Sequence, residues 1–103
     1  MIKVSVLYPS GADHKFDFEY YCNSHMPLCE RLLGPALKGV AVERGLAGAA
    51  PGDPPAYMAM GHLLFDSVEA FQASFGAHEQ EIVADIPNYT NSQPLLQISE
   101  VML

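Results

Sequence analysis

His25 is the residue of this chain best placed to do chemistry, because it lies within an apolar helical stripe. The members of that stripe recur at steps of three and four, which is the spacing of one helical face: Phe18, Tyr21, His25, Leu28 and Leu32. Imidazole has a pKa near neutrality that its surroundings shift easily, so it can accept or donate a proton in catalysis. We therefore predict that His25 is a general acid or base. The alternative is a core histidine that one hydrogen bond satisfies.

A proline two residues after this histidine marks the same segment. Pro27 lies inside the helical pattern, where a proline removes a backbone hydrogen bond and clashes with the preceding turn, at a cost of ~3 kcal/mol or more. Such a cost is tolerated more readily where a bend serves a function. An ordinary helix kink is the alternative interpretation.

Further residues could complete a pocket around His25. His78 shares a later apolar stripe with Phe71, Phe75 and Ile82, and we predict it as a second catalytic residue. Four more residues are predicted to bind substrate on the walls and floor of the pocket: Tyr8, Tyr21, Ala59 and Gly61. Small side chains on a helix-facing strand would leave a void beneath the helices, or would instead let the helices pack closely.

The cysteines do not indicate a metal site or a disulfide. Cys22, His25 and Cys29 fall at i, i+3 and i+7, but zinc needs four ligands and Pro27 interrupts the helical register. Two helical cysteines seven residues apart are ~10 Å apart along the axis, too far for a disulfide. No glycine-rich phosphate-binding loop occurs. We expect no metal, no other cofactor and a reducing cytoplasmic compartment.

These side chains must be positioned by alternating strands and helices. Apolar residues at period two predict strands near 2–8, 37–46, 57–65 and 94–102, and the helical pattern with capping residues at Asp17 and Ser67 predicts helices near 17–33 and 67–84. The order strand-helix-strand-strand-helix-strand is that of the ferredoxin-like α+β fold with a four-stranded antiparallel sheet. The chain is expected to be one domain, residues 1–103.

The composition excludes several classes of partner. The chain has five Lys and Arg but twelve Asp and Glu, which gives a formal net charge of −7. We therefore expect neither nucleic acid nor an anionic membrane surface as a partner. No stretch approaches the ~20 apolar residues that span a bilayer, and we expect no signal peptide before the first predicted strand. A cytoplasmic protein is expected.

One face of the predicted sheet has no helix to cover it. Met58, Met60, His62 and Leu64 alternate onto that face of the third strand, and they are not polar enough for water. Large exposed apolar patches are rare on soluble monomers. We therefore predict a homodimer that buries this face.

The chain resembles the EthD family, named for ethyl tert-butyl ether degradation, in the dimeric α+β barrel superfamily. Three segments carry the resemblance: residues 16–28 with the His25-Met26-Pro27-Leu28 element, residues 64–71, and residues 85–91 together with 97–101. The resemblance implies two ferredoxin-like protomers joined sheet to sheet, each with a small-molecule pocket between sheet and helices. Relatives in that superfamily include cofactor-independent monooxygenases, isomerases, and dehydratases or decarboxylases.

Two classes of function are compatible with these residues. One is a cofactor-independent lyase, isomerase or monooxygenase that acts on a small apolar or aromatic substrate with His25 in proton transfer. The other is a non-catalytic accessory protein that binds a hydrophobic metabolite for a partner enzyme. Conversion of a bound ligand separates the two, because a binding protein returns its ligand unchanged.

Overall fold

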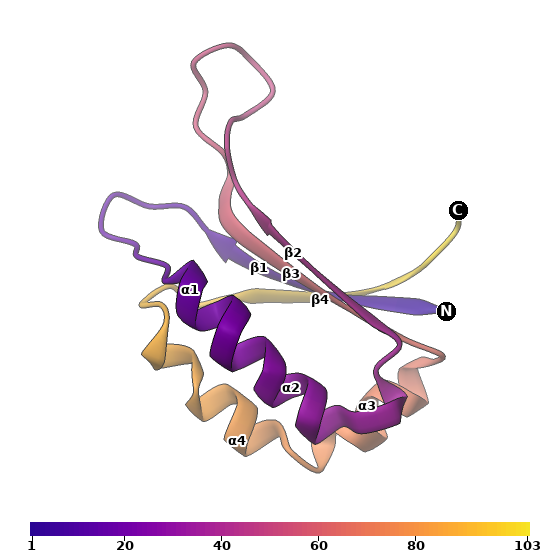
Figure 1. The fold of residues 1–103 in the computed structure, drawn as a ribbon. Coiled ribbons are helices and arrows are strands. Elements are labelled where there is room, and N and C mark those ends of the chain that lie inside the picture. Colours follow the sequence, from indigo (N-terminus) through magenta and orange to yellow (C-terminus); the bar gives the residue numbers. More distant parts are fainter.

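A four-stranded antiparallel sheet forms one layer of the protein (Figure 1). The computed structural model describes all 103 residues. The strands follow the spatial order β2-β3-β1-β4 and span β1 Ile2–Pro9, β2 Gly39–Arg44, β3 Tyr57–Phe65 and β4 Leu95–Glu100. All three pairings are antiparallel. The predicted ferredoxin-like α+β fold is therefore confirmed, with β2 and β4 shorter at their ends than the alternation predicted.

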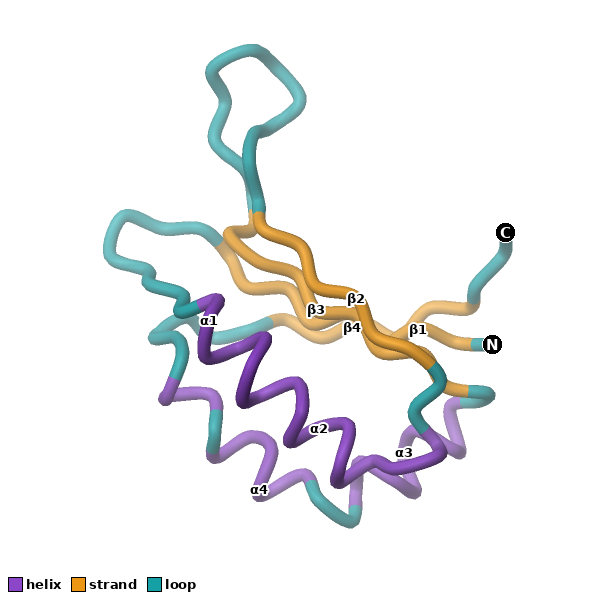
Figure 2. Tube along the Cα trace, viewed as in Figure 1, coloured by secondary structure: helices purple, strands orange, loops and turns teal.

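The helices lie on one face of this sheet, as Figure 2 shows. The first helical run contains α1 Phe18–Tyr20, the π-helical segment η1 Tyr21–His25, α2 Met26–Leu33 and the short 3-10 helix η2 Gly34–Ala36. Asp17 caps its start, because its Oδ1 accepts from the Tyr20 N–H at 3.0 Å. No helix of the protein has the length and apolar character that a bilayer crossing requires.

The first helix contains a wide turn immediately before Pro27. The Met26 N–H donates to the Tyr21 carbonyl five residues earlier, which inserts one extra residue relative to an α-helix. Pro27 then occupies the first turn of α2, where a missing N–H is tolerated. The irregularity expected at Pro27 therefore takes the form of a π-turn ahead of the proline.

The prediction of one continuous helix near 67–84 is wrong, because the structure has two helices there. These are α3 Val68–Gly76 and α4 Glu79–Ala84, followed by the 3-10 helix η3 Ile86–Asn88. The break falls where Gly76 weakens the helix and His78 leaves helical geometry, with φ −131° and ψ 10°. Ser67 caps α3 by accepting from the Ala70 N–H at 3.1 Å.

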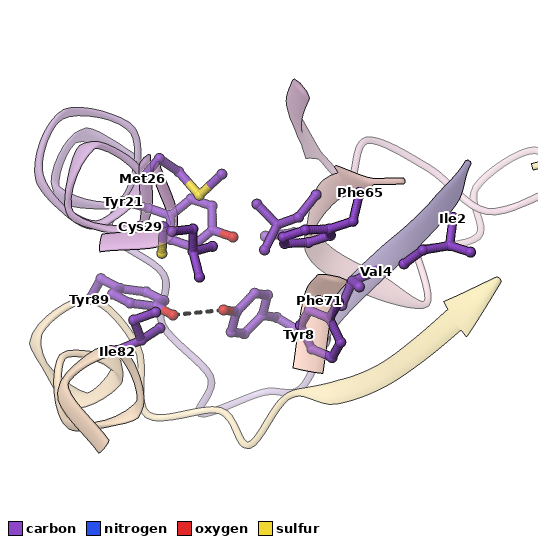
Figure 3. Packing of buried hydrophobic residues seen from close by; sticks show 13 residues of the cluster. Ile2, Val4, Tyr8, Tyr21, Met26, Cys29, Phe65, Phe71, Ile82 and Tyr89 are labelled. Carbon is purple, nitrogen blue, oxygen red and sulfur yellow. Dashed lines mark hydrogen bonds between the residues drawn. The ribbon is translucent and has the colours of Figure 1, made fainter. Parts of the chain in front are cut away.

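The core lies between the helices and the sheet. Its strand residues come from one side of the two central strands, where Val4 pairs with Leu63 and Tyr8 pairs with Ala59. Figure 3 shows the helix residues that meet them. The buried core comprises Ile2, Val4, Tyr8, Tyr21, Met26, Cys29, Leu33, Ala59, Leu63, Phe65, Phe71, Ile82 and Tyr89.

Candidate functional site

His25 is buried at the end of the π-turn, with 4% of its surface exposed. Its ring stacks on Tyr21 at a centroid distance of 5.3 Å and packs against Tyr89 at 4.6 Å. The extra residue of the π-turn also separates the two cysteines, so that Cys22 is exposed while Cys29 is buried beside the imidazole. The π-turn thus keeps Tyr21 and His25 on one buried face, and after it the buried residues of the helix are Met26, Cys29 and Leu33.

Asp85 holds one side of the His25 ring. His25 Nδ1 lies 2.8 Å from Asp85 Oδ2. The other oxygen, Oδ1, accepts from the Tyr20 hydroxyl at 2.7 Å and from Asn88 Nδ2 at 2.9 Å. Because an ionised carboxylate can only accept hydrogen bonds, this contact assigns the imidazole proton to Nδ1 and leaves Nε2 unprotonated, as the acceptor that faces the Cys29 thiol at 3.6 Å.

The surroundings keep the pair as a carboxylate beside a neutral imidazole at neutral pH. Burial lowers the pKa of His25, and the hydrogen bond and charge of Asp85 only partly counteract that effect. Burial opposes ionisation of Asp85, but the hydrogen bonds from Tyr20, Asn88 and His25 outweigh it and hold the pKa of that carboxyl below its usual range. A neutral histidine with its second nitrogen unprotonated is suited to accept a proton.

Cys29 faces that second nitrogen but does not act as a charged nucleophile. Its Sγ lies 3.6 Å from His25 Nε2, and burial raises the pKa of the Cys29 thiol to about 12. The thiol is therefore protonated at neutral pH, whereas a reactive cysteine needs a thiolate. No group of three or more His, Cys, Asp or Glu side chains is arranged to hold a metal ion.

Three tyrosines line a cavity beside His25, and two of them, Tyr21 and Tyr89, contact its ring. The hydroxyls of Tyr8 and Tyr89 lie 2.7 Å apart, a hydrogen bond drawn in Figure 3. The hydroxyl of Tyr21 lies directly above Gly61, where a β-carbon would be 2.1 Å from that oxygen. The small residue therefore makes room for the tyrosine, and helix and sheet approach closely at this point.

A cavity of about 100 Å³ remains between these side chains and the helices. His25, Cys29 and the three tyrosines supply its polar groups, and apolar side chains from both layers form most of the wall. Leu96 of β4 lines the cavity although 52% of its surface is exposed, so the cavity reaches the surface beside the sheet edge. Apolar walls with a few convergent polar groups are typical of ligand sites.

Four of the six residues predicted for the site line this cavity: His25, Tyr8, Tyr21 and Gly61. Ala59 is fully buried in the sheet but does not line the cavity. His78 is half-buried at the junction of α3 and α4 and does not line it either. The break at Gly76 explains this position, because the stripe that contains His78 assumed one continuous helix.

Sequence reasoning did not find Asp85 and Tyr89, which contact His25, or Asn88, which donates to Asp85. They follow α4, about sixty residues after the histidine, and no local periodicity relates the two segments. One signal was available, since the run from Asp85 to Asn91 is part of the family resemblance. That resemblance indicates that the segment matters, but it does not say which of its residues contacts His25.

The fold and this cavity define a ferredoxin-like α+β protein with a small-molecule-sized pocket between sheet and helices. The chain belongs to the EthD family, whose EthD domain it matches over residues 9–93. It is similar to an EthD-like protein from Ralstonia eutropha, with 49% identity, a TM-score of 0.95, and coverage of 99% of this chain and 92% of the other.

Two further relatives are more distant. An ethyl tert-butyl ether degradation (EthD) family protein from Bacillus halodurans is 25% identical with a TM-score of 0.75, and the match covers 99% of both chains. An uncharacterized 11.0 kDa protein from the thcB-thcC intergenic region of Rhodococcus erythropolis is 32% identical over 92 residues, which is 88% of this chain and 85% of the other.

Proposed function

We propose that this protein is a cofactor-independent enzyme that moves a proton on a small, largely apolar molecule, with His25 as the acid–base. The observation that carries this proposal is the orientation of the imidazole. Its Nδ1 is held by Asp85, while Nε2 lies beside Cys29, another residue of the cavity wall. A base whose proton position is set by a carboxylate, in an apolar cavity, is a recurrent arrangement for proton transfer.

Asp85 is assigned here as a positioning residue. It touches the imidazole and not the cavity, and its charge favours the protonated imidazole that forms when His25 accepts a proton. In Asp85→Asn the amide could donate to Nδ1 and so favour the wrong tautomer. The variant should lower kcat by ~10²-fold or more, the usual scale of an acid–base contribution. It should also move the acid limb of the pH profile to lower pH.

The experiment begins with a screen of small apolar and aromatic compounds by thermal shift. A ligand at one hundred times its Kd adds about 2.7 kcal/mol to stability, so binding is readily detected. Bound compounds are then followed for conversion with wild type, His25→Gln and Asp85→Asn. Asp66→Asn is a matched control, because that exposed carboxylate pairs with Lys38 at 3.8 Å and does not line the cavity. Ligands returned unchanged would favour the non-catalytic binding protein.

We also propose that the protein is a homodimer joined through the sheet face that lacks helices. Lys3, Ser5 and Leu7 of β1 pair with Leu64, His62 and Met60 of β3, so these side chains share that face. The face combines apolar residues with a polar network, in which His62 Nδ1 lies 2.8 Å from Ser5 Oγ and Nε2 lies 3.0 Å from Glu43 Oε1. Such a mixed surface suits an interface with a second copy.

A further inference from the structure

An open chain of the three cavity hydroxyls leaves at least one O–H proton without an acceptor inside the cluster. Tyr8 and Tyr89 share one hydrogen bond, and the Tyr21 ring packs edge-on against the Tyr8 ring at a centroid distance of 5.9 Å. Three hydroxyls carry three protons, whereas a chain of three uses at most two of them internally. At least one O–H therefore has no acceptor within the cluster. The remaining polar cavity residues, His25 and Cys29, make no hydrogen bond to it.

This spare donor lies where water competes poorly. All three rings are almost fully buried, at 1% to 3% exposure, and apolar side chains form most of the cavity wall. A buried donor without a partner is unfavourable, so a ligand that supplies an acceptor gains more here than it would on a wet surface. Hydroxyls linked in a chain also polarise one another, which strengthens the terminal donor.

We propose that this O–H binds the carbonyl oxygen of the ligand, and that the cavity therefore takes a small enolisable ketone or aldehyde. This inference rests on the proposed function of His25 and names its substrate class. The hydroxyl cluster and the imidazole line the same cavity, and the Tyr21 and Tyr89 rings both contact the His25 ring. One group can thus hold the carbonyl oxygen while the other takes a proton from the carbon beside it, once the Cys29 S–H has rotated away from Nε2.

The chemical step is an enolisation that needs no oxidant and no second substrate. The α C–H bond breaks and its proton goes to His25 Nε2. The electron pair of that bond forms the new C=C bond, and the carbonyl π pair moves to oxygen as the enolate, which the tyrosyl O–H stabilises. Return of a proton to carbon regenerates the neutral imidazole. Burial raises the pKa of all three tyrosines above the usual range, so they remain donors at neutral pH.

The volume limits the group that enters. A ~150 Å³ apolar cavity in another protein holds benzene, and this one measures about 100 Å³. The enolisable end of the ligand is therefore no larger than a small ring, with any longer part leaving beside the exposed Leu96. Cyclopentanone has as many heavy atoms as benzene, so it serves as the probe with its carbonyl end in the cavity and the opposite edge of its ring at the opening beside Leu96. Methylenecyclopentane is its control, because it replaces only the carbonyl oxygen with CH₂.

The first measurement compares the affinities of these two probes. Wild type should bind cyclopentanone about fivefold to tenfold more tightly, the range expected for one added hydrogen bond. The preference should vanish in the Tyr8→Phe/Tyr21→Phe/Tyr89→Phe variant, which removes the donors and their partners together and is therefore expected to fold. Tyr57→Phe, outside the cavity, should keep the preference. Equal affinity of wild type for both probes would overturn the inference, as would failure of cyclopentanone to bind.

Two measurements on the wild type make the result independent of that variant. The carbonyl stretch of bound cyclopentanone should move to lower frequency than in a hydrocarbon solvent, and an unshifted stretch would overturn the inference. Exchange of its α-hydrogens with D₂O should be accelerated by wild type and lost in His25→Gln. A shifted stretch without exchange would support the carbonyl site while rejecting proton transfer by His25. The two proposals therefore fail in distinguishable ways.

Discussion

Gly61→Ala tests how closely helix and sheet meet beneath the site. A β-carbon at this position would lie 2.1 Å from the Tyr21 hydroxyl oxygen and must move away by about 1.3 Å to reach the 3.4 Å of ordinary contact. Tyr21 is 2% exposed, so its ring can give way only into the cavity that it lines. Overpacking of this kind costs ~1–3 kcal/mol, while the lower entropy of the unfolded alanine chain returns ~0.4–1 kcal/mol. We expect a net loss of about 1–2 kcal/mol.

A second substitution should relieve this clash. In Tyr21→Phe/Gly61→Ala the oxygen is gone, and the nearest ring atom lies 3.2 Å from the new methyl group, only slightly tighter than ordinary contact. The coupling between the two sites should therefore be favourable by about 1 kcal/mol or more, within the range for residues in contact. Urea unfolding of the four proteins at one protein concentration measures it.

Gly76→Ala is the control for this cycle, because nothing lies within 4 Å of a β-carbon there. That substitution should be neutral or stabilising, since alanine is the better helix former. The reasoning would be refuted if Gly61→Ala proved as stable as wild type. It would also be refuted if removal of the Tyr21 hydroxyl made Gly61→Ala no more tolerable.

Three further predictions concern the base, the thiols and the assembly. The rate of His25-dependent exchange should rise with pH along an acid limb whose midpoint lies below pH 6.5. The reason is that burial lowers the pKa of His25 and that only the neutral ring accepts a proton. A midpoint above pH 6.5 would contradict this prediction. Cys22 should react with a thiol reagent at once, whereas Cys29 should react only after unfolding. Cys29 is 3% exposed, and burial raises the pKa of its thiol to about 12. Rapid reaction of both thiols in the folded protein would contradict this prediction. Sedimentation should give twice the 11.2 kDa chain mass, with Met60→Lys shifting the protein toward monomer; a wild-type monomer would eliminate the proposed dimer.

The order of strands and helices was predictable because each element carries a local repeat. Period-two alternation in residues 2–8 and 57–65 locates the two central strands, and the stripe through Tyr21 and His25 correctly turns that histidine toward the sheet. Local capping chemistry also identified Asp17 at the start of the first helix. These features depend on neighbours in sequence, which is what a pattern can report.

The rest depends on contacts that no local pattern records. Asp85 meets His25 from a segment sixty residues away, and its identity as the partner follows only from the packing of η3 against the first helix. The π-turn adds a single residue that no sequence pattern marks, and it moves the buried positions that follow from the predicted Leu28 and Leu32, which are half-buried, to Cys29 and Leu33. The break at Gly76 displaced His78, because a glycine in a helical pattern can either be tolerated or end the helix.

The carboxylate of Asp85 is also a mechanical joint. Tyr20 and His25 donate to it from the first helical run. Asn88 donates to it from η3, the 3-10 helix that begins directly after Asp85. The bonds that orient the imidazole are therefore the bonds that fasten the two helical runs to each other. A substitution that retunes the base also loosens that attachment, so reactivity and rigidity cannot be optimised separately at this position. An engineer seeking new ligands would do better to alter the wall at Leu96, where shape can change while the joint stays intact.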